Sequence, residues 1–389
     1  MISAAARPYI DASVPVLREH GLSITRTFYK NMFAAHPELT RIFNMGNQAN
    51  GSQQQSLAMA VFAYAANIGN PGALGPVVER IVHKHVSVGI EAKHYPIVGE
   101  HLLGAIREVL GEAATPELIA AWAEAYGALA KLLIDTEAAL YGSAQVAPGQ
   151  TRPFRVSAVR KEAADVISLR LVPADGQPVP AFKPGQYVSV AVDFADGSRQ
   201  LRQYSLSDAP DQDSLRISVK REHGGAQPDG QVSNWIHDNV AEGSVLELVH
   251  PFGDFTPDSE SAEPIVLLSA GVGITPMISV LNRIAAVQPQ RHVIFAHAAR
   301  DAAHHAHQAD VAAAQARMPN LRVVNFYEDS NGRMDVAALP HWPRSETPVY
   351  LCGPVGFMRA QWQALQAAGV PASLLRREVF GPELLDHLL

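Results

Sequence analysis

The run from Arg202 to Ser207 combines side chains that could hold a ligand with both a phosphate and a planar ring. Arg202 carries a permanent cation whose flat head can bond a phosphate through two N–H groups. Tyr204 can lie against a planar ring, and the Ser205 hydroxyl can bond a ring nitrogen. The alternative is an ordinary edge strand with a surface arginine, so other parts of the chain must decide between the two.

The same run resembles the Arg-x-Tyr-Ser/Thr signature of ferredoxin-reductase-type flavin domains. It follows a strand-like segment, Gly185 to Val190, in which Tyr187 lies. A flavin dinucleotide needs its pyrophosphate neutralised and its ring held in place, and these side chains meet both needs. The resemblance therefore implies FAD as the ligand.

Two glycine loops farther along could hold a second nucleotide. Gly271 and Gly273 would let the backbone approach a phosphate, and Pro276 suits the first turn of a helix whose free N–H groups attract anions. The third glycine of the dinucleotide fingerprint is absent, so a strand–helix turn without a ligand is the alternative. A second loop, Gly353 to Met358, also follows a strand, at the edge where α/β sheets bind ligands.

His85 is the histidine best placed to be a buried metal ligand. On a helix, the residues three and four positions away from it are apolar or small, whereas His83 has Glu79 and Arg80 on one side. A core histidine that makes an ordinary hydrogen bond is the alternative. Farther along the chain, His304, His305 and His307 do not fall on one helical face, so we expect a solvated surface helix there rather than a metal site.

Bulk composition excludes several classes of protein. With 389 residues, 47% apolar and 18% charged, the chain predicts two or three ordinary globular domains. A net charge of −7 gives no reason to expect a nucleic-acid partner. The single cysteine, Cys352, excludes a disulfide framework and any cysteine-ligated cluster, and it favours the reducing cytoplasm. The most apolar stretch, Leu57 to Ala66, is too short to cross a membrane, and no signal peptide is visible.

The elements that must position these residues fall into three segments. Residues 1–146 show helical spacing, residues 153–257 show alternating strands broken by Gly and Pro, and residues 258–389 alternate apolar strands with helices. The first pattern predicts an all-α domain, the second a small antiparallel β-barrel, and the third an α/β domain with a parallel sheet.

The whole chain, from near its N-terminus to Pro382, resembles bacterial and yeast flavohaemoglobins. The resemblance is carried by Phe28–Phe33, Ile42–Met45, Lys84–His85, Tyr95–Leu103, Lys220–Glu222 and Gly353–Met358. It implies a globin domain with haem b, followed by a ferredoxin-reductase-type module with FAD and NAD(P)H. It also implies dioxygen and nitric oxide as small-molecule partners and a monomer, and it leaves a lipid beside the haem open.

Residue roles follow from the resemblance position by position. His85 would be the iron ligand, with Tyr95 and Glu137 bonded to its far nitrogen. Tyr29 and Gln53 would bond dioxygen on the opposite side of the haem, where Leu57 would shape the space. The remaining implied cofactor contacts are Phe43, Lys84, Tyr187, Arg202, Gln203, Tyr204, Ser205, Gly230, Gln231, Val232, Ser233, Gly271, Gly273, Thr275, Gly353, Pro354, Glu378 and Phe380.

The resemblance implies a nitric oxide dioxygenase that draws electrons from NAD(P)H through FAD to haem and yields nitrate. Two alternatives stay open: an oxygen-binding or oxygen-sensing globin with a maintenance reductase, and a ferric or quinone reductase with an incidental globin. The choice between NADH and NADPH also stays open, because Arg300 and Asp301 after the second strand of the C-terminal domain favour opposite answers.

Overall fold

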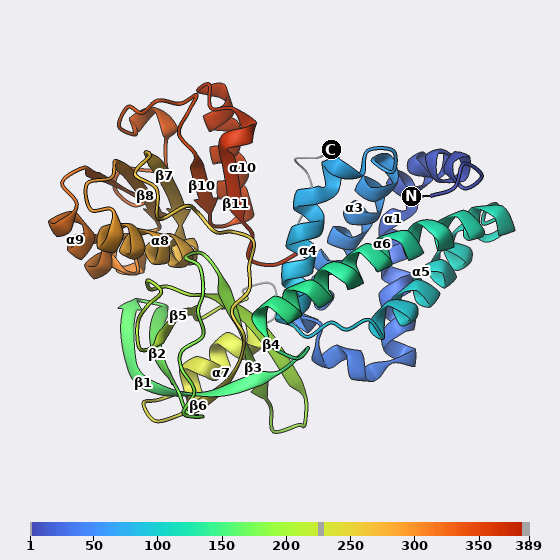
Figure 1. Ribbon diagram of the computed structural model, residues 1–389, viewed down its shortest axis with the longest axis horizontal. Helices are drawn as coiled ribbons and strands as arrows, with labels where there is room; N and C mark the ends of the chain where they lie inside the picture. The colour runs from blue at the N-terminus through green and yellow to red at the C-terminus, as the bar shows by residue number, and fades with distance from the viewer. Residues whose placement is uncertain (1, 225–228, 383–389) are drawn as a thin grey trace. The chain divides into compact units, whose positions relative to one another are not determined.

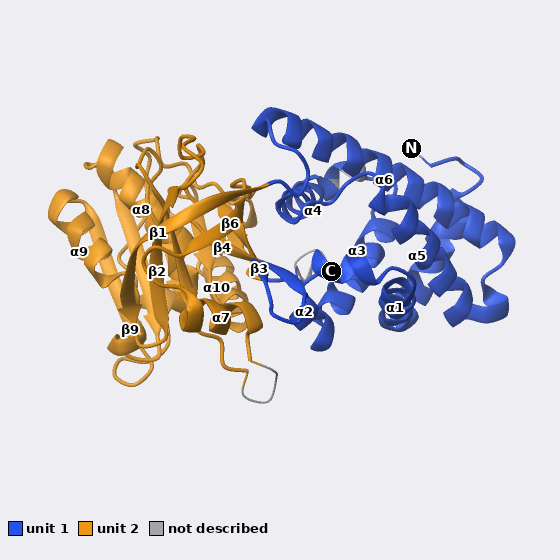
Figure 2. Cartoon of the chain, turned by 90° about the horizontal axis from the view of Figure 1, so that it is seen from below, with its two compact units in different colours: residues 1–150, 192–201, 381–389 blue, residues 151–191, 202–380 orange. Residues whose placement is uncertain are grey.

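The computed structural model describes residues 2–224 and 229–382, which form two compact units (Figures 1 and 2). Unit 1 comprises the described residues up to Gln150, together with Val192–Leu201 and the end of the described chain from Gly381. Unit 2 comprises Thr151–Ala191 and Arg202–Phe380. No helix among the described residues is long and apolar enough to span a bilayer.

Unit 1 is built mainly from helices, as the spacing of its apolar residues predicts. They are α1 (Arg7–Ala35), η1 (Pro37–Arg41), α2 (Met45–Ala49), α3 (Ser52–Ala66), η2 (Pro71–Leu74), α4 (Gly75–Ser87), α5 (His94–Leu110), η3 (Gly111–Ala113) and α6 (Pro116–Ala144). The core between them includes Phe28, Met32 and Ile106, each at most 2% exposed. Thr115 begins α6 by accepting a hydrogen bond from the Leu118 N–H, which satisfies a backbone donor that the first turn leaves open.

A six-stranded sheet in the order β4-β3-β6-β1-β2-β5 makes up most of the first part of unit 2, while the end of β3 and the start of β4 fall in unit 1. Its elements are β1 (Thr151–Ala163), β2 (Val166–Pro173), β3 (Tyr187–Asp193), β4 (Arg199–Ser205), β5 (Leu215–Lys220), α7 (Gln231–Asn239) and β6 (Val245–Val249). The strand pairs of β1 with β2 and β6, of β2 with β5, and of β3 with β6 are antiparallel. An antiparallel bridge between Leu206 and Ile217 brings the chain after β4 back to β5, as expected of a barrel.

The second part of unit 2 is a five-stranded sheet in the order β11-β10-β7-β8-β9. Its elements are β7 (Ile265–Ala270), η4 (Gly271–Gly273), α8 (Ile274–Val287), β8 (Val293–Ala299), η5 (Ala302–His304), α9 (Gln308–Arg317), β9 (Leu321–Tyr327), η6 (Val336–Ala338), β10 (Val349–Cys352), α10 (Val355–Ala367), η7 (Ala372–Leu374) and β11 (Leu375–Glu378). Every neighbouring pair is parallel. The predicted fold class is confirmed in all three parts.

Candidate functional site

Three residues distant in sequence meet in the helical unit; we call them the proximal trio. His85 lies near the end of α4, Tyr95 in the first turn of α5 and Glu137 within α6. His85 Nδ1 lies 2.7 Å from a Glu137 carboxylate oxygen and 3.2 Å from the Tyr95 hydroxyl, and that hydroxyl donates to Glu137 over 2.6 Å. The trio therefore fixes the ring of His85 through one nitrogen only.

The other ring nitrogen of His85 suits a metal. Among the described residues Nε2 has no hydrogen-bond partner, and the side chain keeps 34% of its surface exposed, whereas Glu137 keeps only 4%. A histidine whose Nδ1 is bonded to a carboxylate presents Nε2 as an electron-rich ligand. The residues present thus fit haem iron on the open side of the ring.

A second layer holds the trio in place. The Tyr126 hydroxyl donates to the Tyr95 backbone carbonyl over 2.6 Å. Gly99 makes this contact possible, because a Cβ at that position would lie 2.5 Å from the Tyr126 ring. Burial, followed by the hydrogen bond to Glu137, raises the pKa of Tyr95 well above its usual value, so its phenol stays a donor.

The predicted dioxygen-binding residues also come together; we call Tyr29, Gln53 and Leu57 the distal group. Tyr29 is 4% exposed on α1, and Gln53 and Leu57 are half-buried on α3. Burial raises the pKa of Tyr29 to about 12, while hydrogen bonds with Gln53 and Gln48 partly offset that rise. Phe43 packs edge-on against the Tyr29 ring at 5.9 Å. Sequence reasoning missed Gln48.

The proposed flavin residues lie along β4 and the strand that pairs beside it. Arg202 and Tyr204 are half-buried, Gln203 is exposed, and Tyr187 on β3 is 5% exposed. Burial lowers the pKa of the Arg202 guanidinium, so a neighbouring anion would favour its charged form. The Ser205 hydroxyl is buried and has no hydrogen-bond partner among the described residues, as expected of a group that bonds a ligand.

The N-terminus of α7 supplies backbone donors in the same part of unit 2. No side chain of a described residue caps this helix, so the N–H groups of Gln231 and Val232 are available to an anion. Gly230 precedes it in extended conformation, and a Cβ there would lie 2.6 Å from the Ser233 hydroxyl oxygen. This arrangement fits a pyrophosphate approaching closely along the backbone.

Two loops meet at the carboxyl edge of the parallel sheet, as predicted. A Cβ on Gly273 would lie 2.4 Å from the Cys352 carbonyl oxygen, so the loop after β7 packs directly on the loop that carries Gly353 and Pro354. Gly271 adopts a left-handed φ of 53° with open space at its Cβ position. The Thr275 hydroxyl bonds the Val272 carbonyl over 2.9 Å, so it supports the turn.

Glu378 and Phe380, which were predicted to contact a cofactor, lie at and just after the end of β11, the strand that pairs with β10. Glu378 ends β11 and is 3% exposed, with its carboxylate accepting from the Val379 N–H. Phe380 is 45% exposed. In unit 1, the Lys84 ammonium donates to the Gly381 carbonyl. The roles of Lys84, Glu378 and Phe380 at a cofactor stay predictions.

The prediction of a solvated surface helix for His304, His305 and His307 is wrong. His305 and His307 are 2% and 0% exposed. The three residues do not share a helix: η5 ends at His304, and His307 is the N-cap of α9 with a φ of 61°. Spacing on a single helix was therefore the wrong basis for judging where these rings point.

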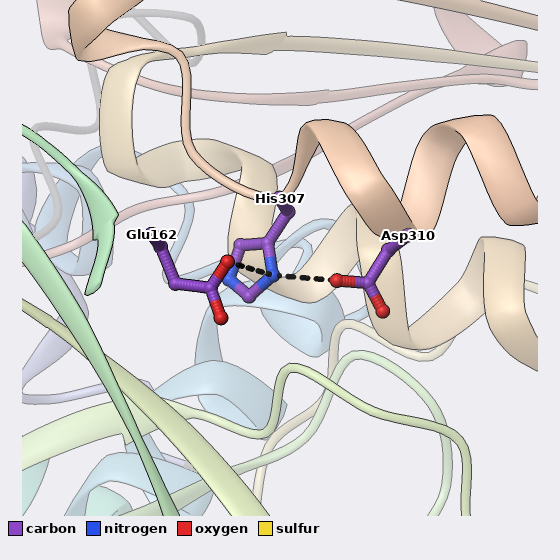
Figure 3. A group of neighbouring side chains, drawn as sticks. All are labelled: Glu162, His307 and Asp310. Atoms are coloured by element: carbon purple, nitrogen blue, oxygen red, sulfur yellow. Dashed lines mark hydrogen bonds and ion pairs between the residues drawn. The ribbon is translucent and has the colours of Figure 1, made fainter. Parts of the chain in front are cut away.

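His307 belongs to a buried ionic network. Within the described part of the chain, Glu162, His307 and Asp310 are the group whose ligand atoms lie within 4.8 Å of one another (Figure 3). Asp310 Oδ1, however, already accepts from the Arg216 guanidinium over 3.0 Å, and a second cation would be repelled there. His307 Nε2 lies 2.8 Å from the Ser218 hydroxyl. The network links the antiparallel sheet to α9.

Comparisons with known proteins agree with the division of the chain into a helical part, an antiparallel-sheet part and a parallel-sheet part. The family models that match are Globin at residues 26–133, Oxidoreductase FAD-binding domain at 153–256 and Oxidoreductase NAD-binding domain at 267–363. Flavohemoproteins of Bordetella parapertussis and Bacillus subtilis are 49% and 40% identical to the chain, cover 98% and 96% of it, and are themselves covered over 99% and 96% of their length.

Two solved structures extend the comparison. A flavohemoglobin from Malassezia yamatoensis, with bound FAD and heme, is 30% identical, has a TM-score of 0.87, and the alignment covers 98% of this chain and all of that one. The FAD/NAD-binding domain of a Vibrio cholerae nitric oxide dioxygenase is 38% identical with a TM-score of 0.56, over 59% of this chain and 99% of that one.

Fold and site together define a haem-containing flavin oxidoreductase that takes electrons from a nicotinamide nucleotide. The chain belongs to the flavohaemoglobin family. Its cofactors are haem in the globin domain and FAD in the antiparallel domain, with an NAD-binding domain after them.

Proposed function

We propose that the protein is a nitric oxide dioxygenase that converts nitric oxide and dioxygen to nitrate at the expense of NAD(P)H. The observation that carries the proposal is the proximal trio, with Glu137 2.7 Å from His85 Nδ1, in one chain with a complete flavin and nicotinamide module. The balanced reaction consumes two nitric oxide and two dioxygen molecules per NAD(P)H and forms two nitrate ions, NAD(P)⁺ and one proton.

When bound, haem supplies an iron that takes up a diatomic ligand, and FAD supplies a carrier that accepts a hydride and releases single electrons. The proximal trio would then determine how much electron density the His85 imidazole donates to the iron. Glu137 would make the His85 imidazole a stronger electron donor to bound haem iron, which would favour its oxidation. Tyr95 holds the carboxylate in the orientation that His85 needs.

The distal group supplies a hydrogen-bond donor to dioxygen. Tyr29 has its pKa raised to about 12, so its hydroxyl stays protonated throughout the physiological range and can donate to partly negative dioxygen. The Gln53 carboxamide lowers the pKa of the phenol, and we infer that it restricts how the hydroxyl turns. Leu57 is apolar and half-buried on the same helix as Gln53, so it narrows the space without offering a competing bond.

The reductase residues bind and orient the two nucleotides. Arg202 and the free N–H groups of α7 neutralise the flavin pyrophosphate, while Tyr204 and Ser205 hold the ring. The loops of Gly271 and Gly353 bring backbone against the nicotinamide nucleotide. A reductase joined to a globin domain in one chain favours turnover over storage, because an oxygen carrier needs re-reduction only rarely.

The rate of nicotinamide oxidation in air, before and after nitric oxide is added, tests the proposal. A dioxygenase must show a sharp, sustained rise, because each turnover consumes an electron. An oxygen store with a maintenance reductase would show a brief response at most. A ferric or quinone reductase would oxidise NAD(P)H rapidly with those acceptors and would not respond to nitric oxide. Support for the proposal also comes from the Vibrio cholerae domain, whose parent protein is named a nitric oxide dioxygenase.

A further inference from the structure

The chain that leaves β4 is bonded directly to α8, the helix that begins at the glycine loop after β7. β4 ends at Ser205, and Asp208 follows three residues later with a side chain that is 17% exposed. The Ser279 hydroxyl of α8 donates to the Asp208 backbone carbonyl over 2.7 Å, and the Asn282 carboxamide donates to Asp208 Oδ1 over 2.9 Å. We call Asp208, Ser279 and Asn282 the clasp.

The sequence of α8 places both donors of the clasp on one face of the helix. Ser279 and Asn282 are three positions apart, so their side chains are neighbours on the helix surface. Val280 and Leu281 between them are 0% exposed, as is Ser279 itself. A serine inside a helix can bond a carbonyl of the preceding turn, but Ser279 bonds the Asp208 carbonyl, which lies 71 positions earlier. The polar face of α8 therefore serves the segment after β4.

The antiparallel sheet holds Asp208 from the other side. Arg216 of β5 donates through Nε to the Ser207 carbonyl over 3.0 Å, and the Arg170 guanidinium of β2 lies 3.4 Å from Asp208 Oδ2. The Ala209 N–H donates to Asp208 Oδ1 over 2.9 Å. Because polar groups left unpaired away from water are costly, the segment is fixed against α8 from two sides.

Each end of this connection leads to a nucleotide site. β4 carries the flavin signature from Arg202 to Ser205, and η4, directly before α8, carries the glycine loop for the nicotinamide nucleotide. In the reaction between them, a hydride leaves the dihydronicotinamide ring, which is oxidised, and joins the flavin ring, which is reduced. The reacting atoms must lie about 3–3.5 Å apart, and a misplacement of about 1 Å can cost roughly a hundredfold in rate.

We propose that Asp208 is a positioning residue for hydride transfer, which through Ser279 and Asn282 sets where the nicotinamide loop lies relative to the flavin strand. The proposal rests on the FAD- and NAD-binding domains and not on nitric oxide turnover. A merely structural contact would lower thermal stability when it is cut, and it would leave the rate of transfer in the assembled protein unchanged.

The test uses the full-length protein loaded with haem and FAD. Asp208→Ala removes the acceptor of Asn282, Ser279→Ala removes the bond to the backbone carbonyl, and the double variant removes both. Asp208→Asn keeps an oxygen that can accept from Asn282, so it is the conservative rescue. Asp211→Asn is the matched control, because Asp211 lies in the same segment and bonds Arg283 of α8 over 2.7 Å, but its side chain is 76% exposed.

Three measurements separate alignment of the two rings from stability of the fold. Anaerobic stopped flow gives the limiting rate of flavin reduction at saturating NADH or NADPH, whichever reduces the parent protein faster. The same nucleotide with deuterium at the transferred position gives the primary isotope effect. Calorimetric titration with the oxidised nucleotide gives a dissociation constant without turnover, and the FAD content of each variant shows whether the flavin domain is intact.

We expect Asp208→Ala and Ser279→Ala each to lower the limiting rate about threefold, because the remaining bond still holds the segment, and the double variant to lower it roughly thirtyfold or more. The isotope effect should rise in the double variant, since transfer of the hydrogen itself then limits the rate. The dissociation constant and the FAD content should stay at the parent values. Asp208→Asn and Asp211→Asn should match the parent protein in every measurement.

A limiting rate at the parent value in the double variant would overturn the proposal, as would an equal loss in Asp211→Asn. A loss that disappears at higher nucleotide concentration would also overturn it, because the clasp would then serve binding. Should the double variant lose FAD, the two single variants decide in its place, and parent rates in both would overturn the proposal. A parent protein that fails to consume nitric oxide would leave these flavin measurements unaffected, and only the proposed function would fall.

Discussion

At the scale of single residues, His85 is the position on which haem retention depends. It is the histidine whose Nδ1 is held by Glu137 and Tyr95, and its Nε2 has no hydrogen-bond partner in the described part of the chain. His85→Ala should lose haem or leave it weakly bound, whereas His83→Ala should keep the parent spectrum. The haem-to-protein absorbance ratio of the two purified variants measures this. The reverse outcome would mean that the helical register of α4 presents the wrong histidine.

Tyr29 is the second residue for which we make a quantitative prediction, here for the rate of dioxygen release. Loss of one buried donor to the ligand costs about 1–3 kcal/mol, and about 1.4 kcal/mol is a tenfold change in rate. Tyr29→Phe should therefore release dioxygen roughly tenfold faster or more, as measured by stopped flow, and nitric oxide turnover should fall with it. Electron transfer from NADH to haem provides the control and should stay intact. Release at the parent rate would show that Tyr29 serves only in packing.

At the scale of elements, the Arg202 side chain of β4 should control FAD retention and leave haem binding in the globin domain unchanged. Removing the charge-assisted phosphate contact of Arg202 costs roughly 1.5–3 kcal/mol. Arg202→Ala should weaken FAD retention and stop haem reduction by NADH, while dithionite-reduced haem still binds dioxygen. Arg155→Ala on the exposed face of β1 is the matched control. Normal FAD content and normal haem reduction in the Arg202 variant would remove Arg202 from the flavin site.

Elements were predictable where the deciding pattern is local. The alternation in β2 and β5, the apolar runs of β7 and β8, and the glycine loop after β7 are each contained in a few consecutive residues. The proximal trio spans 52 positions, from His85 to Glu137, and spacing alone could not separate it from a core histidine. The family resemblance brought these residues together in advance, and packing shows how they meet.

Two features of the structure could not be predicted from the sequence, for physical reasons. Helical spacing misplaced His307, because the chain there leaves η5 and turns through a left-handed residue before α9 begins. Gln48 was missed because a five-residue helix has no periodicity that predicts its facing side. The one signal for it was the unbroken run of amides from Gln53 to Gln55 in a stretch without charges. The limits of the three domains and the individual cofactor roles stay predictions.

At the scale of the whole molecule, the buried network around His307 should hold the two halves of unit 2 together. Asp310 joins Arg216 of β5 to His307, and Arg216 is only 7% exposed. Burial would raise the pKa of Asp310, but the His307 hydrogen bond and the Arg216 charge together hold it well below its usual range. The carboxylate is therefore ionised, and its removal leaves the buried Arg216 guanidinium with a more distant acidic neighbour, Asp208 at 3.9 Å.

Asp310→Asn should lower the free energy of unfolding by roughly 3–5 kcal/mol, because one partner of a buried ion pair is lost. Thermal unfolding of the full chain, followed by the rise in FAD fluorescence on release, measures this. Glu328→Gln is the control, since its ion pair with Arg333 is exposed and should contribute less than about 1 kcal/mol. Equal melting temperatures for the two variants would show that the network does not hold unit 2 together.

The central claim concerns the fate of nitric oxide, and the nitrate formed per NAD(P)H oxidised in air tests it most directly. The full-length protein, loaded with haem and FAD, should convert nitric oxide to nitrate in a ratio of two nitrate ions to each nicotinamide, with no nitrite beyond the spontaneous reaction. Nitric oxide that disappears only at its spontaneous rate, or that ends as nitrite while NAD(P)H oxidation continues unchanged, would contradict the account.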